Sequence, residues 1–318
     1  MPQSETFFSP LTANYVDIKH FLCVLAAADS QTQGSKPVKP KIVRSIEGLR
    51  RETAKWRNDD LTFAIVPTMG ALHEGHLALV AEGLEQADKV LVTIFVNTKQ
   101  FGANEDLSRY PRDEAGDVAK LAETGAHLIF APSPEEMYGP DFATTVVLKG
   151  PAKANLEDKF RPHFFDGVST IVAKLFIQSG ADFAMFGQKD YQQLLVVTQM
   201  ARDLDMPIKV IGVPTLRASD GLALSSRNQY LTKTERGQAT AIHKSLTQAA
   251  EKIRNGTDPQ KAMRAASRSL TTLGFKVDYV TARNAETLAV PQSHSDEPLR
   301  LLAAAWLGKT RLIDNIEV

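Results

Sequence analysis

Two histidines, separated by two residues, stand in a segment whose pattern suits phosphate binding. The segment reads VPTMGALHEGH from Val66 to His76, so an apolar strand ends in a glycine-containing loop and a helix is expected to begin near His76. Free N–H groups at a helix start attract phosphate, and imidazoles three residues apart can face one ligand. His73 and His76 are therefore candidate phosphate donors. The alternative is that one histidine is a surface residue and the other caps the helix.

Amide and lysine side chains follow two further predicted strands. Asn97 and Gln100 come directly after the apolar run VLVTIFV. Their uncharged amides suit a small substrate with hydroxyl and carboxylate groups, or alternatively a plain polar turn. Lys189 follows the run FAMFG and could offer a charge to phosphate, with Gln193 one turn along the next helix. The alternative there is Asp190 as a helix N-cap with Lys189 in solvent.

A fourth segment, DGLALSSRN from Asp220 to Asn228, carries two hydroxyls followed by an arginine. Ser225, Ser226 and Arg227 could clamp phosphate, and the clamp could close when a second domain moves. A turn with a helix cap is the alternative. The four segments are individually weak signals. Taken together, they favour ATP chemistry on a small carboxylate, because that reaction uses both the amides and the phosphate-binding groups.

Alternating strands and helices are expected to position these segments. Strands are predicted at 61–66, 90–96, 128–131, 183–186 and 208–213, and helices at 46–56, 76–87, 113–124, 168–178 and 191–203. This rhythm predicts an α/β fold with a Rossmann-like, doubly wound parallel sheet, which binds ligands outside the carboxyl ends of its strands. Helices at 233–255 and 259–273 and strands at 276–282, 299–305 and 310–316 predict a smaller α+β domain. We expect domains at 41–214 and 215–318.

Composition limits the classes of protein and the compartment. The chain has 318 residues, and Lys plus Arg equals Asp plus Glu at 37 each, which argues against a broad nucleic-acid or membrane surface. The single cysteine, Cys23, suits a reducing compartment, so a cytoplasmic protein is expected. Residues 1–40 are predicted to be a mobile extension with at most one short helix near 15–28. The apolar stretch 21–28 leaves export as the alternative.

These segments resemble those of the pantothenate synthetase family in their order, their spacing and their residues. His73-Glu74-Gly75-His76 is similar to the His-x-Gly-His signature of the wider nucleotidylyltransferase superfamily, and Leu224 to Arg227 stand where that superfamily has a mobile phosphate-binding loop. The strings AAAWLG (303–308) and RLIDN (311–315) also resemble the last strands of the family. The resemblance runs from residue 41 to 318. It implies a ligase that joins pantoate to β-alanine through a pantoyl-adenylate, with ATP and Mg²⁺.

The resemblance also implies roles for individual residues. The catalytic residues would be His76, His73 and Lys189, with His76 as the acid or phosphate-stabilising group. Pantoate would contact Gln100, Gln193 and Asn97, and Gln100 would also lie near β-alanine. ATP would contact Met69, Gly70, Ala71, Leu72, His73, Glu74, Gly75, His76, Gly187, Gln188, Lys189, Asp190, Leu216, Leu224, Ser225, Ser226 and Arg227. The residues that bind the metal are not identified. A homodimer is implied by the family alone.

Three positions depart from the usual family pattern. Thr98 stands where a proline usually follows the asparagine, and Gln188 stands where a glutamate is usual. The pattern Arg-Pro-x-His-Phe-x-Gly-Val appears as RPHFFDGV over 161–168, so Phe164 takes the place of the histidine and His163 precedes it. Either His163 restores the contact from one residue earlier, or the contact is lost.

Two other classes of protein would share part of this pattern. A nucleotidylyltransferase that stops at nucleotide transfer would need only the phosphate-binding groups, and Gln100 and Gln193 argue against it because they suit a hydroxy-acid pocket. A nucleotide-binding regulator without catalysis is supported only by Thr98 and Phe164. A pyrophosphate-release assay with pantoate and β-alanine separates the three.

Overall fold

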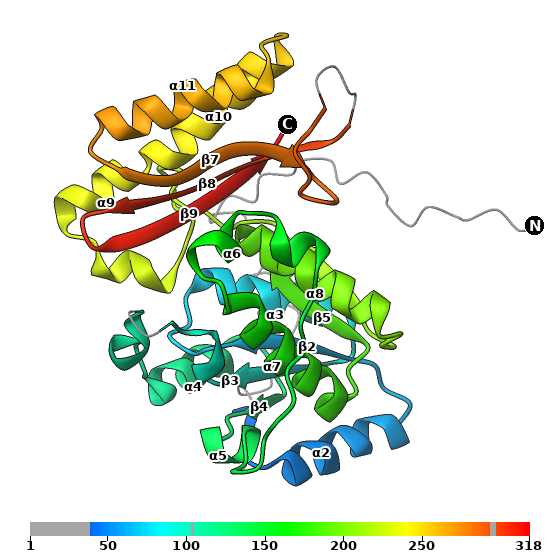
Figure 1. Cartoon of the computed structure of the whole chain (residues 1–318). Helices are drawn as coiled ribbons and strands as arrows, with labels where there is room; N and C mark the ends of the chain where they lie inside the picture. The colour runs from blue at the N-terminus through cyan, green and yellow to red at the C-terminus, as the bar shows by residue number, and fades with distance from the viewer. Residues whose placement is uncertain (1–38, 103–104, 293–296) are drawn as a thin grey trace, which may run out of the picture.

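A six-stranded sheet forms the centre of the chain between residues 41 and 213. The computed structural model describes residues 39–102, 105–292 and 297–318. The neighbouring strands run parallel, in the order β1-β4-β3-β2-β5-β6 (Figure 1). They are β1 (Lys41–Val43), β2 (Phe63–Thr68), β3 (Lys89–Ile94), β4 (Leu128–Phe130), β5 (Phe183–Gly187) and β6 (Lys209–Val213).

Helices cover both faces of this sheet, because successive side chains of each strand point to opposite sides. In β2, Phe63 and Ile65 pack in one apolar cluster, and Ala64 and Val66 pack in another. The first cluster includes residues of α2 (Ile46–Asn58), α7 (Phe164–Ser179) and α8 (Tyr191–Asp203), and the second includes residues of α3 (Glu74–Gln86) and α4 (Glu114–Ala122). Burial on both faces explains why the strands read as continuous apolar runs.

The chain leaves the middle of the sheet in two opposite directions. From β2 it moves outward through β3 to β4, and later it builds β5 and β6 on the other side of β2. The direction in which successive strands are added to the sheet therefore reverses between β2 and β5. In doubly wound sheets, ligands bind at this kind of reversal, beside the carboxyl ends of the strands. The α/β, Rossmann-like class predicted from the sequence is confirmed by this topology.

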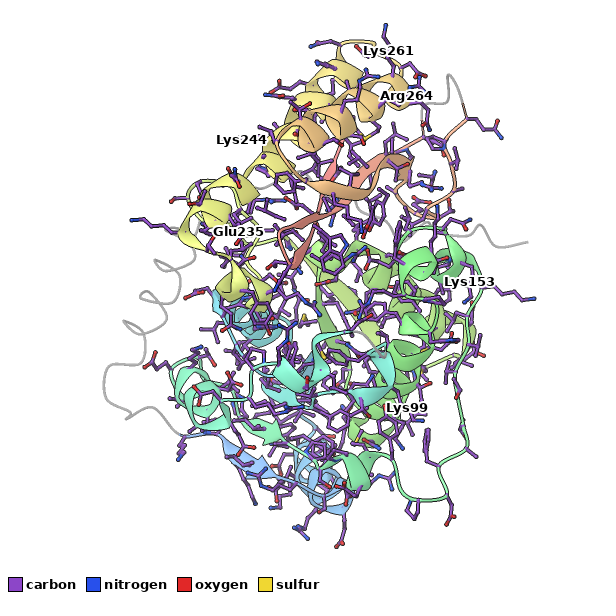
Figure 2. The ribbon with its side chains drawn as sticks, turned by 60° about the vertical axis from the view of Figure 1, so that its left-hand side comes forward. Lys99, Lys153, Glu235, Lys244, Lys261 and Arg264 are labelled. Atoms are coloured by element: carbon purple, nitrogen blue, oxygen red, sulfur yellow. The ribbon has the colours of Figure 1, made fainter. Side chains whose placement is uncertain are left out.

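A smaller antiparallel sheet follows, formed by three strands that the sequence predicts near 276–282, 299–305 and 310–316. Its strands β7 (Lys276–Asn284), β8 (Leu299–Leu307) and β9 (Thr310–Glu317) pair in sequence order. The helices α10 (Ala241–Arg254) and α11 (Pro259–Thr272) pack on the side of this sheet that faces away from the parallel sheet (Figure 1). Helix α11 buries Met263 and Leu270, whereas Lys261 and Arg264 project outward (Figure 2). The domain division at 214/215 stays a prediction.

Several short elements escape the sequence pattern because they are too short to repeat the periodicity that reveals a helix or strand. They are β1, α5 (Pro134–Met137), α6 (Glu157–Phe160) and the 3₁₀ turns η1 (Thr98–Gln100), η2 (Asp106–Arg109), η3 (Gly150–Lys153), η4 (Gln188–Asp190) and η5 (Ser226–Tyr230). The helix predicted at 233–255 is divided at Thr240 into α9 (Lys233–Ala239) and α10. The Thr240 hydroxyl donates to the carbonyl of Gly237 at 3.0 Å, a side-chain bond of the kind that competes with helix continuation.

Three predictions on the N-terminal segment fall outside the described residues. These are the helix near 15–28, the mobility of the extension 1–40 as far as residue 38, and the export alternative that rests on the stretch 21–28. In the part of the chain that is described, no helix is both long enough and apolar enough to cross a membrane.

Candidate active site

One cavity of about 1280 Å³ brings the four sequence segments together. It lies at the carboxyl ends of β2, β3, β5 and β6, and residues of β7, β8 and β9 line it from the other side. The predicted site residues that line it are Met69, His73, Gly75, His76, Asn97, Gln100, Gly187, Lys189, Asp190, Gln193, Leu216, Leu224, Ser225, Ser226 and Arg227. The predicted ATP contacts that do not line it are Gly70, Ala71, Leu72, Glu74 and Gln188.

The two histidines cap helix α3 with their own rings. His73 Nδ1 accepts a hydrogen bond from the N–H of Gly75 (3.1 Å), and His76 Nδ1 accepts one from the N–H of His73 (3.3 Å). Because each Nδ1 is an acceptor, the proton of each neutral ring is on Nε2. The capping and phosphate-binding interpretations are therefore compatible, since capping uses Nδ1 and leaves Nε2–H as the donor for a ligand.

Both rings are neutral in the free protein at neutral pH. Burial lowers the pKa of His73 to about 2, and the nearby His76 and Lys189 contribute to the same shift. Burial also lowers the pKa of His76 to about 4, again with a contribution from Lys189. The negative charge of a bound polyphosphate would act in the opposite direction and favour the protonated rings.

A buried carboxylate holds the loop before α3. Gly70 and Ala71 have positive φ angles of 79° and 52°. Asp117 of α4, which is 2% exposed, accepts hydrogen bonds from the N–H of Ala71 (2.9 Å) and of Leu72 (2.7 Å). Lys120 donates to the carbonyl of Leu72. The N–H groups that the sequence suggests for phosphate are therefore engaged within the protein at these two residues.

The second segment is ordered by Asn97. This side chain is 1% exposed, and its Nδ2 donates to Gln100 Oε1 (2.9 Å) and to the carbonyl of Gly167 (3.1 Å). Its Oδ1 accepts from the Tyr138 hydroxyl (2.6 Å). The Gln100 amide also approaches Met69, with Nε2 at 3.1 Å from Sδ. All polar atoms of the Asn97 side chain have protein partners, so its geometry is that of a group that orients Gln100.

Helix α7 approaches η1 closely at a glycine. A Cβ atom at Gly167 would lie 2.4 Å from the carbonyl oxygen of Lys99 and 2.7 Å from the nitrogen of Gln100. The backbone of α7 therefore supports the turn that carries Gln100, and Gly167 allows this contact because it has no side chain.

The two residues at the start of α7 differ in their surroundings. Phe164 holds the position of the family histidine, and its ring lies beneath the Arg161 guanidinium, with 3.6 Å from Cζ to the ring centroid. His163 is the exposed N-cap residue of α7 and lines the cavity. Arg161 in turn binds both carboxylate oxygens of Glu105, at 2.6 and 2.7 Å. A histidine therefore reaches the cavity from one residue earlier than the family pattern places it.

Asn315, close to the C-terminus, fixes the backbone of the third segment. Its Nδ2 donates to the carbonyls of Gln188 (2.9 Å) and Lys189 (2.8 Å). The Lys189 ammonium lies at the cavity, 3.3 Å from the Asp190 carboxylate. Asp190 stands at the N-cap position of α8 but makes no side-chain cap bond. The Gln188 side chain accepts a bond from Arg300 at 3.4 Å rather than lining the cavity.

The fourth segment lies beside the first. The Ser225 hydroxyl accepts from the N–H of Arg227 (3.3 Å) and caps η5. A Cβ atom at Gly75 would lie 3.8 Å from Cβ of Leu224, so the start of α3 and the beginning of this loop are neighbours. The two hydroxyls and the arginine therefore face the same cavity as His73.

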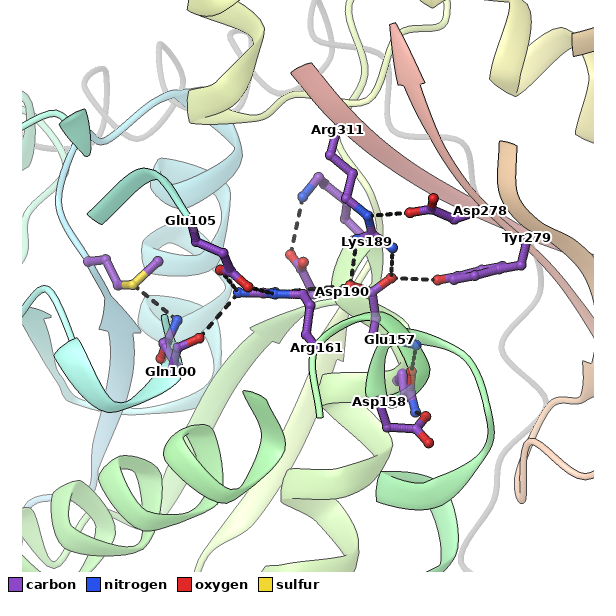
Figure 3. A network of polar contacts seen from close by, with 12 residues as sticks. Gln100, Glu105, Glu157, Asp158, Arg161, Lys189, Asp190, Asp278, Tyr279 and Arg311 are labelled. Carbon is purple, nitrogen blue, oxygen red and sulfur yellow. Dashed lines mark hydrogen bonds and ion pairs between the residues drawn. The ribbon is translucent and has the colours of Figure 1, made fainter. Parts of the chain in front are cut away.

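A buried ionic cluster next to the cavity joins the antiparallel sheet to α6 (Figure 3). Arg311 of β9 binds both carboxylate oxygens of Glu157 in α6, at 2.7 and 2.9 Å, and its Nε binds Asp278 of β7 at 2.8 Å. Tyr279 donates its hydroxyl to Glu157 at 2.8 Å. The Glu157 and Arg311 side chains are 8% and 13% exposed, so removal of either partner would leave a poorly solvated charge.

Sequence reasoning gave no role to Asp117, Tyr138, Glu157 or Asn315. The partners described above for the first three lie 41 to 154 positions away in the chain, and those of Asn315 lie 126 and 127 positions away. No local pattern reveals such pairings. The only available signal was for Asn315, which belongs to the RLIDN string shared with the family.

The chain matches known proteins over nearly all of its described length. A family model described as Pantoate-beta-alanine ligase matches residues 41–317. A pantothenate synthetase of Nitrobacter hamburgensis is 52% identical over 282 residues, which are 89% of this chain and 100% of that protein. A pantothenate synthetase of a Bradyrhizobium species is 52% identical over 279 residues, which are 88% of this chain and 99% of that protein.

Solved structures show the same similarity. A pantothenate synthetase from Thermus thermophilus is 43% identical, with a TM-score of 0.82, and the match covers 87% of this chain and 99% of that one. The pantoate-beta-alanine ligase from Francisella tularensis, complexed with beta-gamma ATP and beta-alanine, is 32% identical, with a TM-score of 0.72 and coverage of 87% and 97%. The family match includes every residue of the cavity described above.

Proposed function

This chain belongs to the pantoate–β-alanine ligase family, and on that premise we propose how its residues carry out the reaction of the family. The enzyme condenses pantoate with β-alanine at the expense of ATP, through a pantoyl-adenylate. In the first half, a pantoate carboxylate oxygen attacks the α-phosphorus and pyrophosphate leaves. In the second half, the β-alanine amine attacks the activated carbonyl, the bond to the phosphate oxygen breaks, AMP leaves and the nitrogen loses a proton.

The observation that carries the assignment of roles is the meeting of two kinds of donor in one cavity. Neutral amides from Gln100 and Gln193 line the same space as the imidazoles of His73 and His76 and the ammonium of Lys189. The first kind suits a hydroxy acid and the second suits a polyphosphate. A cavity with both supports the transfer of a nucleotide onto a small carboxylate.

For adenylate formation, we assign the stabilisation of pyrophosphate to groups at the start of α3, after β5 and in the fourth segment. His73 and His76 donate from Nε2, while Lys189 and Arg227 supply positive charge and Ser226 supplies a hydroxyl. Such donors lower the barrier when they are already oriented toward the charge that develops in the transition state. Capping by Nδ1 supports this role, because it fixes both rings before the ligand arrives.

For the acid substrate, we assign pantoate to Gln100 and Gln193. The Gln193 amide lines the cavity and has no side-chain hydrogen bond among the described residues, so it is available to a ligand. Gln100 has its Oε1 fixed by Asn97, which directs its Nε2. We therefore give Asn97 a positioning role in place of the direct contact with pantoate inferred from the family, and β-alanine is expected near Gln100.

Mg²⁺ is proposed to accompany ATP. The described residues contain no group of three or more His, Cys, Asp or Glu side chains able to hold a metal ion. The lysine, arginine, histidine and hydroxyl groups of the cavity suit phosphate, and Mg²⁺ in nucleotide sites is commonly held by substrate phosphates, waters and at most one or two carboxylates. When bound, the ion would neutralise part of the polyphosphate charge.

We also propose a homodimer formed through the parallel-sheet part of the chain. Val147 is 63% exposed and Ile177 of α7 is 66% exposed, the two highest exposed fractions among the large hydrophobic side chains of the described residues. The segment with Val147 is tied to α7, because the N–H of Val146 donates to the Thr170 hydroxyl at 3.0 Å. Val147 therefore follows a residue that is bonded to the helix that carries Ile177. Sedimentation analysis tests the dimer.

A cytoplasmic location is proposed from the sequence alone. One cysteine in 318 residues is typical of a chain that does not use disulfides. The family match begins at residue 41, which supports the separation of residues 1–40 from the catalytic part.

The reaction is tested by following its products. Pyrophosphate should form from ATP only when pantoate is present, and AMP should be released only when β-alanine is added. ADP with orthophosphate would refute the mechanism. His76→Ala should lower pyrophosphate formation by about 10²-fold, the scale of losing one transition-state donor. Unchanged pyrophosphate release by the folded variant would exclude the role of His76.

The pantoate assignment has its own test. Gln193→Ala should weaken pantoate binding by roughly 1–3 kcal/mol, because polar groups of the bound substrate would lose their partner. ATP binding should change much less. Calorimetric titration of each ligand distinguishes the two, and equal losses for both would contradict the assignment.

A further inference from the structure

Asp117 is a buried carboxylate that the proposed reaction does not use. It lies on α4, outside the cavity, and both of its oxygens accept backbone N–H groups, Oδ2 from Ala71 and Oδ1 from Leu72. Lys120, one turn further along the same helix, donates to the carbonyl of Leu72. Asp117 and Lys120 therefore bind three backbone polar groups of the loop that precedes α3. We call this pair the loop clamp.

The loop needs this clamp because of its backbone conformation. Ala71 has a φ angle of 52°, a region that non-glycine residues avoid, and Gly70 before it also has positive φ. The turn directs the N–H groups of Ala71 and Leu72 toward α4, where water has little access. Buried N–H groups are costly unless they are paired, and one carboxylate can accept two of them.

The clamp is connected to the catalytic rings through the main chain. Leu72 immediately precedes His73, whose N–H donates to His76 Nδ1 and whose own ring caps the helix. A rotation of the Leu72 peptide would therefore move the N–H that orients the second imidazole. On the basis of the proposed function, we propose that Asp117, supported by Lys120, is a positioning residue that holds the His76 ring in the orientation needed for adenylate formation.

Asp117→Asn is the most direct test. Asparagine has the same shape, but its Nδ2 is a donor, so one of the two backbone N–H groups loses its acceptor. We expect kcat for pyrophosphate release to fall about 10-fold or more, since a small displacement of catalytic groups has effects of this size, while KM for ATP changes less than about 3-fold. The control is Asp113→Asn, which alters the cap of the same helix (Gly116 N to Asp113 Oδ1, 3.0 Å) without touching the loop. Its kcat should stay unchanged.

A double-mutant cycle shows whether Asp117 acts through the histidine. If it does, adding Asp117→Asn to His76→Ala should slow the reaction by less than about 2-fold, because the group it positions is already missing. Full multiplication of the two single effects would overturn the proposal. Should Asp117→Asn fail to fold by circular dichroism, Lys120→Met, which removes the other half of the clamp, takes its place in the same cycle with the same expected pattern.

Histidine NMR separates this inference from the proposed function. In the ligand-free wild-type protein, the ¹⁵N shifts of His73 and His76 should report Nε2-protonated rings, and Asp117→Asn should change those of His76, whereas Asp113→Asn should not. Unchanged His76 shifts in Asp117→Asn would refute the clamp even if the enzyme is active. Absence of pyrophosphate release from the wild-type protein would refute the proposed function, yet the shift changes would still be observed if the clamp exists.

Discussion

Replacing Gly167 by alanine tests whether the packing of α7 against η1 controls the pantoate site. The new Cβ would lie 2.4 Å from the carbonyl oxygen of Lys99, 2.6 Å from its carbon and 2.7 Å from the nitrogen of Gln100. All three are backbone atoms, so no side-chain rotation can relieve the contact. An ordinary contact needs about 3.4 Å or more, so η1 and α7 must separate by about 1 Å.

The consequences of this separation can be worked out from the same contacts. Gly167 lies inside a helix, where alanine is better by about 1 kcal/mol, while overpacking costs about 1–3 kcal/mol, so the net loss of folding free energy should be modest. The effect on catalysis should be larger. The bond from Asn97 to the Gly167 carbonyl would lengthen and Gln100 would shift with η1, and a 1 Å displacement of a positioning group can cost about 10²-fold in rate.

The assay is pyrophosphate release with pantoate varied at saturating ATP. Gly167→Ala should reduce kcat/KM for pantoate by about 10-fold to 10²-fold, with a smaller change in the KM for ATP. Gly237→Ala in α9 is the matched control, because a Cβ there meets no atom within 4 Å. It should leave the kinetics unchanged and raise the melting temperature slightly. A folded Gly167→Ala variant with wild-type pantoate kinetics would refute the reasoning.

Three further outcomes are expected. Thr98→Pro should raise the free energy of unfolding by about 0.4–1 kcal/mol and leave the kinetics unchanged. Thr98 is the first residue of η1 and follows a residue with extended backbone, which is a position that proline fits. A lower melting temperature of the variant would contradict this. Tyr138→Phe removes the hydroxyl bond that orients the second segment, so calorimetry should show weaker pantoate binding and unchanged ATP binding. Burial lowers the pKa of both His76 and His127 to about 4, so below pH about 6.5 the unfolded chain binds more protons than the folded chain. The melting temperature should therefore fall as the pH is lowered from about 6.5 to about 5. A constant melting temperature over this range would exclude the effect.

The sequence was sufficient to predict those helices, strands and strand ends that a local apolar pattern marks. The bounds of α8 were predicted as 191–203 and are observed there, because a helix of this length repeats its apolar period several times. The positions of His73 and Lys189 at strand ends follow from the same pattern, since each stands just after an apolar run. A parallel sheet then brings those ends to one edge, which is why residues more than a hundred positions apart meet in one cavity.

The sequence was insufficient to predict which groups distant in the chain are hydrogen-bonded to the residues of the site. The family resemblance assigns Ala71 and Leu72 to ATP, and it does not reveal that their N–H groups bind Asp117, 46 and 45 positions away. It assigns Asn97 to pantoate, and it does not reveal that the Asn97 side chain binds Gln100, Gly167 and Tyr138. Donor and acceptor types can be read from a sequence, but their occupancy depends on helix packing, which no local spacing encodes.

The bonds from Asn315 to the backbone of Gln188 and Lys189 have a consequence for biosynthesis. Asn315 stands 126 positions after Lys189 in the chain. At a synthesis rate of about 5–20 residues per second, roughly 6–25 s pass between the two. The parallel sheet can assemble during this interval, but the loop with Lys189 gains these two bonds only after residue 315 has been synthesised. A nascent chain therefore has the nucleotide-binding scaffold before it has the finished site, and residue 315 must leave the ribosome before the first turnover.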